Sequence, residues 1–395
     1  MPTSDKLTVH LSAVTPLFLG GAEPNERAEL RPPSIKGLLR YWYRALDGEH
    51  PTWERRLFGS TDTGQAPCLL SVSEWREGTQ PWERSHYSRP FNPSNPHQGG
   101  FQRGGGRSGQ NGLVYLGFSL TLPPNNRKAL SPGEGLTIAV LPRPQQSKEW
   151  DDRKASKMRR AWLAGLWLLV HVGGVGTRSR RGLGSLRIEE WDGWSECDEL
   201  PLPSNANAPQ EWLSRLEKGL GVLRQWFPRE PGGDQTAVKQ GARFHVLQQG
   251  HPSWESALDD AGLRLQQFRQ RKLPDYSDVK VCLNGGALAT GPERAGFGLP
   301  LTFRYGSLNG ASVTFAGTDH GRMASPLLIR VLRLGNQYHA AFIHLPAPLL
   351  PGGERVKGRR GNREVGPLLW HPNARAIIQE FLDTKVKPDA LEVTL

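Results

Sequence analysis

One stretch decides the fold of the first half of this chain: residues 29–46 read ELRPPSIKGLLRYWYRAL. Apolar side chains recur in it at helical spacing, at Ile35, Leu38, Leu39, Trp42 and Leu46. Ser34 is a natural N-cap residue and Gly48 is a natural end, so the stretch predicts a helix that begins at Ser34. The preceding residues 6–14 (KLTVHLSAV) alternate apolar and polar side chains, which predicts a half-buried strand.

Outward from this strand and helix, the pattern predicts an α+β fold. The first half is expected to contain a short helix at 51–58, strands at 68–72, 113–122 and 136–141, a long helix at 147–172 and a strand at 185–190. The order strand, helix, strand, strand, helix, strand is that of ferredoxin-like domains. RNA-recognition domains use the same order.

The second half predicts a decorated copy of the same unit. We expect helices at 211–227, 252–272 and 373–382, and strands at 299–305, 312–316, 327–334, 338–344 and 390–395. The chain is therefore expected to form two ferredoxin-like (RRM-like) βαββαβ modules, at residues 1–198 and 210–395. Residues 199–209, with their prolines and polar residues, are expected to be the linker.

The charge of the chain is concentrated in one part. The formal net charge is +12 over 395 residues, and residues 84–187 alone hold 17 basic and four acidic residues, a net +13. Such a concentration favours a polyanionic partner such as nucleic acid over an enzyme that acts on small acidic metabolites. The alternative is a solvated helix face around residues 153–160.

Other patterns exclude several classes of protein. The three cysteines form neither a CxxC nor a Cys/His ligand spacing, which argues against a disulfide framework and a zinc site and fits a reducing cytoplasm. No histidine pair has metal-binding spacing, and the glycine-rich stretch lacks a P-loop ending, so we expect no metal and no nucleotide cofactor. The start of the chain lacks signal-peptide features, and the apolar run at 161–170 is half of the roughly 20 residues that span a bilayer. No membrane partner is expected.

The helix start at residues 33–37 (PSIKG) is a candidate site for an RNA phosphate. The first amides of a helix point outward and attract anions, and Ser34, Lys36, Gly37 and Arg40 lie on this first part of the helix. The alternative is an ordinary capped helix with solvated cations.

A second candidate is the glycine-rich stretch at 174–187, GVGTRSRRGLGSLR. It follows a predicted helix and leads into a strand, the reverse of a dinucleotide-binding loop. Arg178, Arg180 and Arg181 lie among glycines, which suits a flexible clamp on a sugar-phosphate chain. The alternative is a plain turn between helix and strand.

Six stretches, in the same order along the chain, resemble the RAMP superfamily, and within it the family of the first-named subunit of the type III-B CRISPR (Cmr) effector. They are TPLFLGGA (15–22), ELRPPSIKGLLRYWYRAL (29–46), ERRLFGST (54–61), GVGTRSRRGLGSL (174–186), GFGLPLTF (296–303) and RMASPLLIRV (322–331). The resemblance implies a non-catalytic, RNA-binding subunit at the end of a filament of other RAMP subunits. It would contact the 3′ part of the crRNA and the target RNA in antiviral defence, and a partner subunit would cleave the target.

The resemblance also implies which residues contact RNA. The glycine-rich loop, with Gly182 and its arginines, matches the shared RNA-contacting element of the superfamily. Lys36, Arg40 and Arg44 match the block that faces the guide RNA, and Arg322 belongs to the last matching stretch. The Gly/Arg-rich segment 99–112 matches no family motif, and an RNA-gripping hairpin there is a hypothesis.

An alternative keeps the superfamily but changes the class of protein. It is a metal-independent endoribonuclease that processes crRNA precursors, with His10 as a candidate general base. A third class, a DNA-binding regulator, would need a helix-turn-helix or zinc-finger signature, which the sequence lacks. Incubation with precursor RNA in EDTA distinguishes the first two classes, because a binder leaves the RNA intact.

Overall fold

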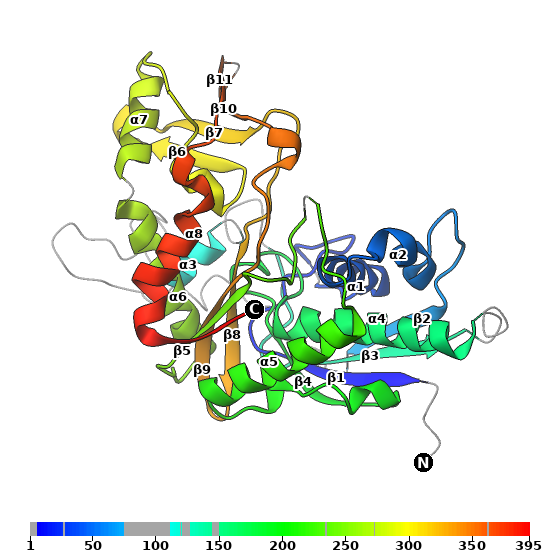
Figure 1. The fold of residues 1–395 in the computed structure, drawn as a ribbon. Coiled ribbons are helices and arrows are strands. Elements are labelled where there is room, and N and C mark those ends of the chain that lie inside the picture. Colours follow the sequence, from blue (N-terminus) through cyan, green and yellow to red (C-terminus); the bar gives the residue numbers. More distant parts are fainter. Residues whose placement is uncertain are drawn as a thin grey trace.

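Three four-stranded antiparallel sheets organise the chain in the computed structural model (Figure 1). The structure describes residues 6–26, 28–74, 111–118, 120, 127–143, 150–233, 235–271, 273–361 and 363–395. Nearly all of the Gly/Arg-rich segment 99–112 lies outside these residues.

The first sheet has the strand order β2-β3-β1-β4. Its elements are β1 (Leu7–Ala13), α1 (Pro32–Leu46), α2 (His50–Phe58), β2 (Cys68–Glu74), β3 (Gly135–Pro142), α4 (Asp152–His171) and β4 (Leu186–Asp192). In β1, buried and half-buried residues alternate, as the sequence pattern predicts. Helices α1 and α4 cover the apolar face of this sheet, and the alternation therefore places its buried residues in a core shared with both helices.

The strand expected at residues 113–122 is wrong, because residues 111–117 form helix α3 (Asn111–Gly117). The side chain of Asp259, on α6 (Trp254–Arg271), accepts hydrogen bonds from the first amides of α3, at Gly112 (2.7 Å) and Leu113 (3.1 Å). The two helices approach so closely that a Cβ on Gly262 of α6 would collide with the Gly112 carbonyl. The contacts that stabilise this helix thus come from α6, about 150 residues away in the sequence, and cannot be seen in the sequence of α3 itself.

The second sheet has the order β12-β5-β9-β8. It comprises β5 (Arg243–Leu247), β8 (Leu327–Leu334), β9 (Gln337–His344) and β12 (Ala390–Thr394), with α6 and α8 (Ile377–Phe381) packed on one face. The expected helix at 373–382 is divided into a short 3-10 turn, α8 and a π turn at Leu382–Val386. In both sheets, a strand, a helix, two strands, a helix and a strand follow along the chain, with the fourth strand beside the first.

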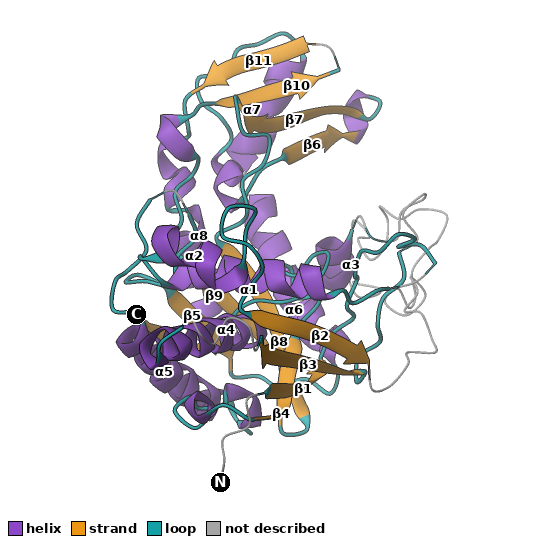
Figure 2. Cartoon of the chain, turned by 90° about the vertical axis from the view of Figure 1, so that its right-hand side faces the viewer, coloured by secondary structure: helices purple, strands orange, loops and turns teal. Residues whose placement is uncertain are grey.

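The third sheet, of order β11-β10-β7-β6, is built from two insertions into the second half. They contribute α7 (Leu273–Leu283), β6 (Leu301–Tyr305), β7 (Ala311–Gly317), β10 (Val356–Arg360) and β11 (Arg363–Leu368). Figure 2 shows this sheet at the top of the molecule, apart from the other two. It has its own apolar core, which includes Phe303, Tyr305 and Phe315.

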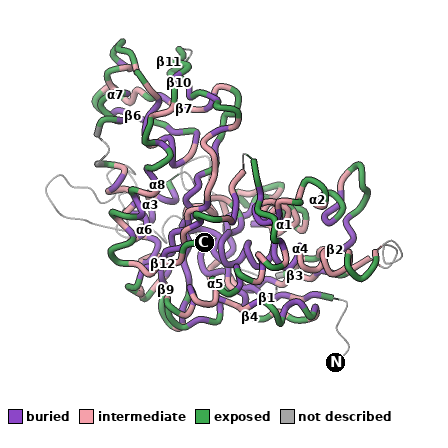
Figure 3. Tube along the Cα trace, in the orientation of Figure 1, coloured by how far each residue is buried: buried purple, intermediate pink, exposed green. Residues whose placement is uncertain are grey.

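The largest core joins the two halves of the chain. Helix α5 (Pro209–Trp226) lies between α4 and the second sheet, and Trp212 and Leu220 on α5 are buried with Trp167 of α4 and Phe244 of β5. Two residues of the expected linker 199–209, Leu200 and Ala206, are buried in the same core. Figure 3 shows this continuous buried region at the centre of the chain.

Candidate nucleic-acid interface

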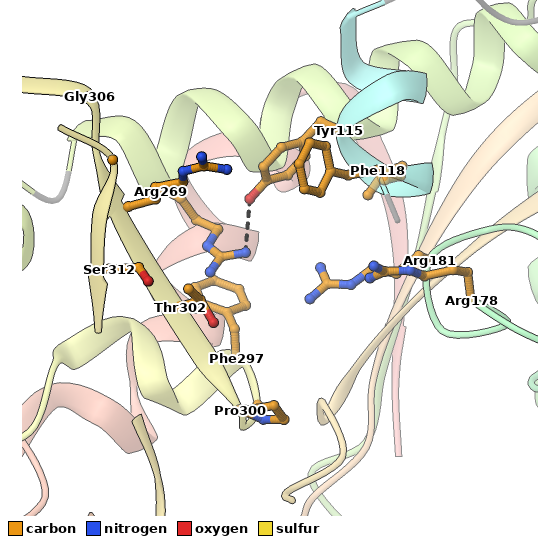
Figure 4. A pocket seen from close by; sticks show the side chains of 14 residues that line it. Tyr115, Phe118, Arg178, Arg181, Arg269, Phe297, Pro300, Thr302, Gly306 and Ser312 are labelled. Carbon is orange, nitrogen blue, oxygen red and sulfur yellow. Dashed lines mark hydrogen bonds between the residues drawn. The ribbon is translucent and has the colours of Figure 1, made fainter. Parts of the chain in front are cut away.

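A cleft of about 1110 Å³ lies where the glycine-rich loop faces α3, the end of α6 and the third sheet. We call it the arginine cleft, because four arginines line it: Arg178, Arg181, Arg269 and Arg304. Figure 4 shows Arg178 and Arg181 pointing from the loop toward Arg269, with the rings of Tyr115 and Phe118 on a third side. Its lining residues, all in the described part of the chain, include no aspartate, glutamate or histidine.

The glycine-rich loop is held against the second sheet and is not a free turn. The backbone carbonyl of Arg180 accepts a hydrogen bond from the amide of Ile329 on β8 (3.1 Å). Gly182 has a φ of +88°, and a Cβ there would collide with the Leu258 side chain of α6. Its carbonyl accepts a hydrogen bond from the Thr15 hydroxyl (2.9 Å). Gly182 is therefore needed for loop conformation and packing, while the loop presents neighbouring side chains to the cleft.

A buried cation supports the base of this loop. Arg330 of β8 is 1% exposed and donates hydrogen bonds to the carbonyls of Gly173 and Leu186 (3.2 Å for the latter). Burial lowers the pKa of Arg330 to about 9. These bonds fix the two ends of the glycine-rich segment to the second sheet.

The surroundings of Arg181 in the cleft lower the pKa of its guanidinium. Burial, together with repulsion from Arg269 and Arg178, lowers the pKa of Arg181 to about 10. Among the described residues that line the cleft, there is no carboxylate to pair with Arg181, Arg269 or Arg304. Because the cations of the cleft repel one another, an anion that entered it would be attracted to several of them at once.

Arg269 is held in place by aromatic side chains. Its guanidinium lies 5.7 Å from the centre of the Phe297 ring and donates a hydrogen bond to the Tyr115 hydroxyl (2.8 Å). Its Nε is buried and has no hydrogen-bond partner in the described structure. The group is thus oriented in advance and retains donor capacity for a ligand.

Of the three loop arginines expected to form a clamp, two line the cleft and one does not. The Arg180 guanidinium donates hydrogen bonds to the Ser325 carbonyl and to the Tyr41 hydroxyl of α1 (2.7 Å). It also lies 5.8 Å from the centre of the Tyr41 ring. Through these contacts Arg180 connects the glycine-rich loop to Tyr41 of α1 and to Ser325, and it is not among the residues that line the cleft.

The helix start differs from the expected anion site. Helix α1 begins at Pro32, its N-cap is Arg31, and no side chain caps it, so Ser34 is not the N-cap. The first two helical residues are prolines and have no N–H, and the amides of Ser34 and Ile35 both donate to the Arg31 carbonyl. The amides that would hold an anion are therefore missing or occupied. Proline at the first position, favoured for its fixed φ, explains the earlier start.

The side chains expected to face the guide RNA fall into two groups. Arg40 and Arg44 lie near the carboxylate of Glu54 on α2, with N–O distances of 2.7 and 3.5 Å, and so connect α1 to α2. Lys36 is half-buried, and Gly37 is exposed with open space beyond it. Arg322 is exposed in the connection before β8. Lys36, Gly37 and Arg322 remain open to a partner, whereas Arg40 and Arg44 already have one.

Sequence reasoning identified only Arg178 and Arg181 among the residues that line the cleft, and it missed the aromatic and basic side chains Tyr115, Phe118, Arg269 and Arg304. The missed side chains come from α3 and the residue that follows it, from α6 and from β6, three segments that only the tertiary fold brings together. The one available signal was that aromatic residues follow the Gly/Arg-rich segment. Because residues 113–122 were expected to form a strand, the sequence did not indicate that these aromatic residues face the glycine-rich loop.

The alternative nuclease site gains no support from the geometry. His10, on β1, shares a hydrogen bond of 3.0 Å with the Thr137 hydroxyl of β3. A hydroxyl neither activates nor orients an imidazole as a carboxylate would. In the described residues, no group of three or more His, Cys, Asp or Glu side chains is arranged to hold a metal ion. The helices that the structure describes include none that is long and apolar enough to cross a membrane.

Comparison with known proteins finds one family. Residues 10–187 match the family model of the RAMP superfamily. Two Pyrococcus furiosus proteins are similar in sequence. CRISPR system Cmr subunit Cmr1-1 is 26% identical over 275 residues, which cover 68% of this chain and 74% of that protein. Subunit Cmr1-2 is 26% identical over 212 residues, which cover 45% and 92%.

Two solved structures share the fold. The crystal structure of Cmr1 from Pyrococcus furiosus matches with a TM-score of 0.60 and 18% identity over 98% of both chains. A chain of the type III-B Cmr-beta complex, solved with cognate target RNA, AMPPnP and single-stranded DNA, matches with a TM-score of 0.50 and 13% identity. That match covers 96% of this chain and 99% of the other. At these identities the structural likeness shows a shared fold.

Proposed function

We propose, from the premise that this chain is a RAMP-superfamily relative of the Cmr1 subunits, that it is an RNA-binding subunit of a type III-B CRISPR effector. In that role it contacts the 3′ part of the crRNA and the target RNA at the end of a filament of RAMP subunits in the cytoplasm. Its partners are then the crRNA, the target RNA and the neighbouring RAMP subunits.

The arginine cleft is the observation that carries this proposal. It combines four arginines with aromatic rings, and its lining, within the described residues, includes no carboxylate; single-stranded RNA-binding grooves use the same combination of cations and rings. Two of its cations, Arg178 and Arg181, belong to the glycine-rich loop that the family resemblance assigns to RNA. The strand order of the first two sheets supports the interpretation of both as ferredoxin-like modules, an architecture common among RNA-binding domains.

The proposed role is non-catalytic, and a partner subunit cleaves the target RNA. General acid-base cleavage requires a titratable side chain within hydrogen-bond reach of the reacting hydroxyl. The lining of the arginine cleft, within the described residues, offers arginines, hydroxyls and aromatic rings for this purpose and no imidazole or carboxylate. Such a surface binds and positions RNA.

The test is the salt dependence of RNA binding. Fluorescence anisotropy of a labelled guide RNA, titrated with the full chain at about 50 to 200 mM salt, gives the slope of log affinity against log salt. The triple variant R178A/R181A/R269A removes three cations of the cleft. If each neutralises one phosphate of a single strand, the slope should become shallower by about two.

The matched control is Arg55→Ala, an exposed arginine on α2 that pairs with exposed Asp62. This variant should keep the affinity and the slope of the parent. A parent chain that does not bind RNA, or that binds with a flat salt response, would contradict the proposed function. An unchanged slope in the triple variant would mean that the arginine cleft does not contribute to RNA binding.

A further inference from the structure

The geometry points to the arginine cleft as a pocket for a short unpaired stretch of RNA, with one base stacked on Phe118 and adjacent phosphates held by Arg181 and Arg269. This inference rests on the proposed function and deepens it. It adds that the ligand at this site is single-stranded, so that the cleft selects an unpaired end or a displaced nucleotide over a continuous duplex.

Size is the first argument. The volume of about 1110 Å³ lies just above the range of roughly 300 to 1,000 Å³ typical of pockets for small ligands. The loop, α3 and β6 enclose the space on three sides (Figure 4). A few nucleotides of one strand match this volume, whereas a stretch of double helix of the same length has about twice the volume.

The aromatic side chains are the second argument. Phe118 is 42% exposed and lies at the cleft beside cations, so its ring is accessible from the cleft. The Tyr115 ring next to it is held by the hydrogen bond between its hydroxyl and Arg269. Base stacking on such rings is independent of sequence, but it requires that the face of the base be free. Within a continuous duplex, both faces of each base are already stacked on neighbouring base pairs.

The arrangement of charge is the third argument. Arg181 and Arg269 approach from opposite walls, and the buried Nε of Arg269 lacks a hydrogen-bond partner in the described structure. A phosphate between them would accept bonds from both and relieve their mutual repulsion. Arg304 on β6 continues the cationic lining toward the third sheet. The cleft thus brings a ring for one base together with cations for the adjacent phosphates.

The experiment uses the full chain and three RNAs that contain 2-aminopurine, whose fluorescence falls when it stacks. They are a single-stranded pentamer, a blunt duplex, and the same duplex with a three-nucleotide unpaired 3′ tail that carries the probe. We expect additional quenching and tight binding with the pentamer and the tailed duplex, and weaker binding without additional quenching for the blunt duplex.

Variants of Phe118 test the stacking partner. Phe118→Ala should abolish the quenching and weaken binding of the tailed duplex by roughly 5- to 100-fold, the loss expected for one stacked base. Phe118→Trp should retain both, because it keeps an aromatic face. The matched control is Leu69→Ala on β2, an apolar side chain of similar exposure (44%) that is not part of the cleft lining.

The outcomes separate this inference from the proposed function. If the parent binds all three RNAs equally, or if Phe118→Ala quenches and binds like the parent, the single-strand inference fails while RNA binding stands. If the parent binds none of them at any salt concentration, the proposed function fails and the inference fails with it. Thermal melting of each variant confirms that the compared proteins are folded.

Discussion

Replacing Arg40 by alanine should destabilise the fold, because this side chain neutralises a buried carboxylate. Glu54 has a side chain only 11% exposed, and Arg40 Nε lies 2.7 Å from its Oε1, with Arg44 farther away at 3.5 Å. Exposed ion pairs contribute about 0 to 1 kcal/mol, and breaking a fully buried pair costs about 3 to 5 kcal/mol. Arg40 is 30% exposed, so this pair lies between the two cases. We expect Arg40→Ala to lower the free energy of unfolding by about 2 kcal/mol.

The assay is equilibrium unfolding in guanidinium chloride, with RNA affinity measured on the same samples. Lys36→Ala, one turn earlier on α1, is the control, since Lys36 is not one of the cations paired with Glu54, and this variant should change stability by less than about 0.5 kcal/mol. The reasoning is refuted if Arg40→Ala unfolds at the parent's denaturant midpoint and loses RNA affinity. Arg40 would then serve the ligand, as the family resemblance implied, and the contact with Glu54 would contribute nothing measurable.

Three further outcomes are expected. Burial, with repulsion from Arg330, lowers the pKa of His171 to about 3. This histidine therefore stays neutral in the folded chain while the unfolded chain takes up a proton below pH 6.5. The free energy of unfolding should fall by about 2 kcal/mol from pH 6.5 to 5 on this account, and His171→Gln should flatten the measured pH profile by one proton. Gly182→Ala should lower the melting temperature and weaken RNA binding together, because its φ of +88° and the contact with Leu258 leave no room for a methyl group; an unchanged melting curve would contradict this. Asp259→Ala removes the acceptor for the first amides of α3 and should cost about 1 kcal/mol in denaturant unfolding, with Asp259→Asn restoring most of it.

Elements with a strong periodic pattern of their own could be predicted from the sequence. The strand at 327–334 was predicted with its observed limits, because eight mostly apolar residues are bounded by turn residues on both sides. Helix α4 followed from its apolar stripe. Strands β10 and β11 were missed, since their residues are largely polar or glycine and pair at the exposed end of the third sheet. Helix α3 was missed because Asp259 supplies its cap from another helix.

The candidate site was predictable only where one segment carried it. The glycine-rich loop and its arginines were found, but nothing in the local sequence distinguishes Arg180, which binds Ser325 and Tyr41, from Arg181 next to it, which faces the cleft. The aromatic wall and Arg269 depend on the contact of α3 with α6. Tertiary packing decides the direction in which each of these side chains points, and residue type and spacing do not predict that direction.

The way the third sheet is assembled constrains how this chain can vary among relatives. One insertion supplies the hairpin β6-β7 and the other, 39 residues further along the sequence, supplies β10-β11; only the pairing of β7 with β10 makes them one sheet. Loss of either hairpin would leave the survivor with a bare edge strand, a state prone to aggregation, and loss of β10-β11 would also remove Val356 and Leu368 from the apolar core. The two insertions should therefore be present or absent together, and a trimmed chain that keeps the first two sheets must delete both at once.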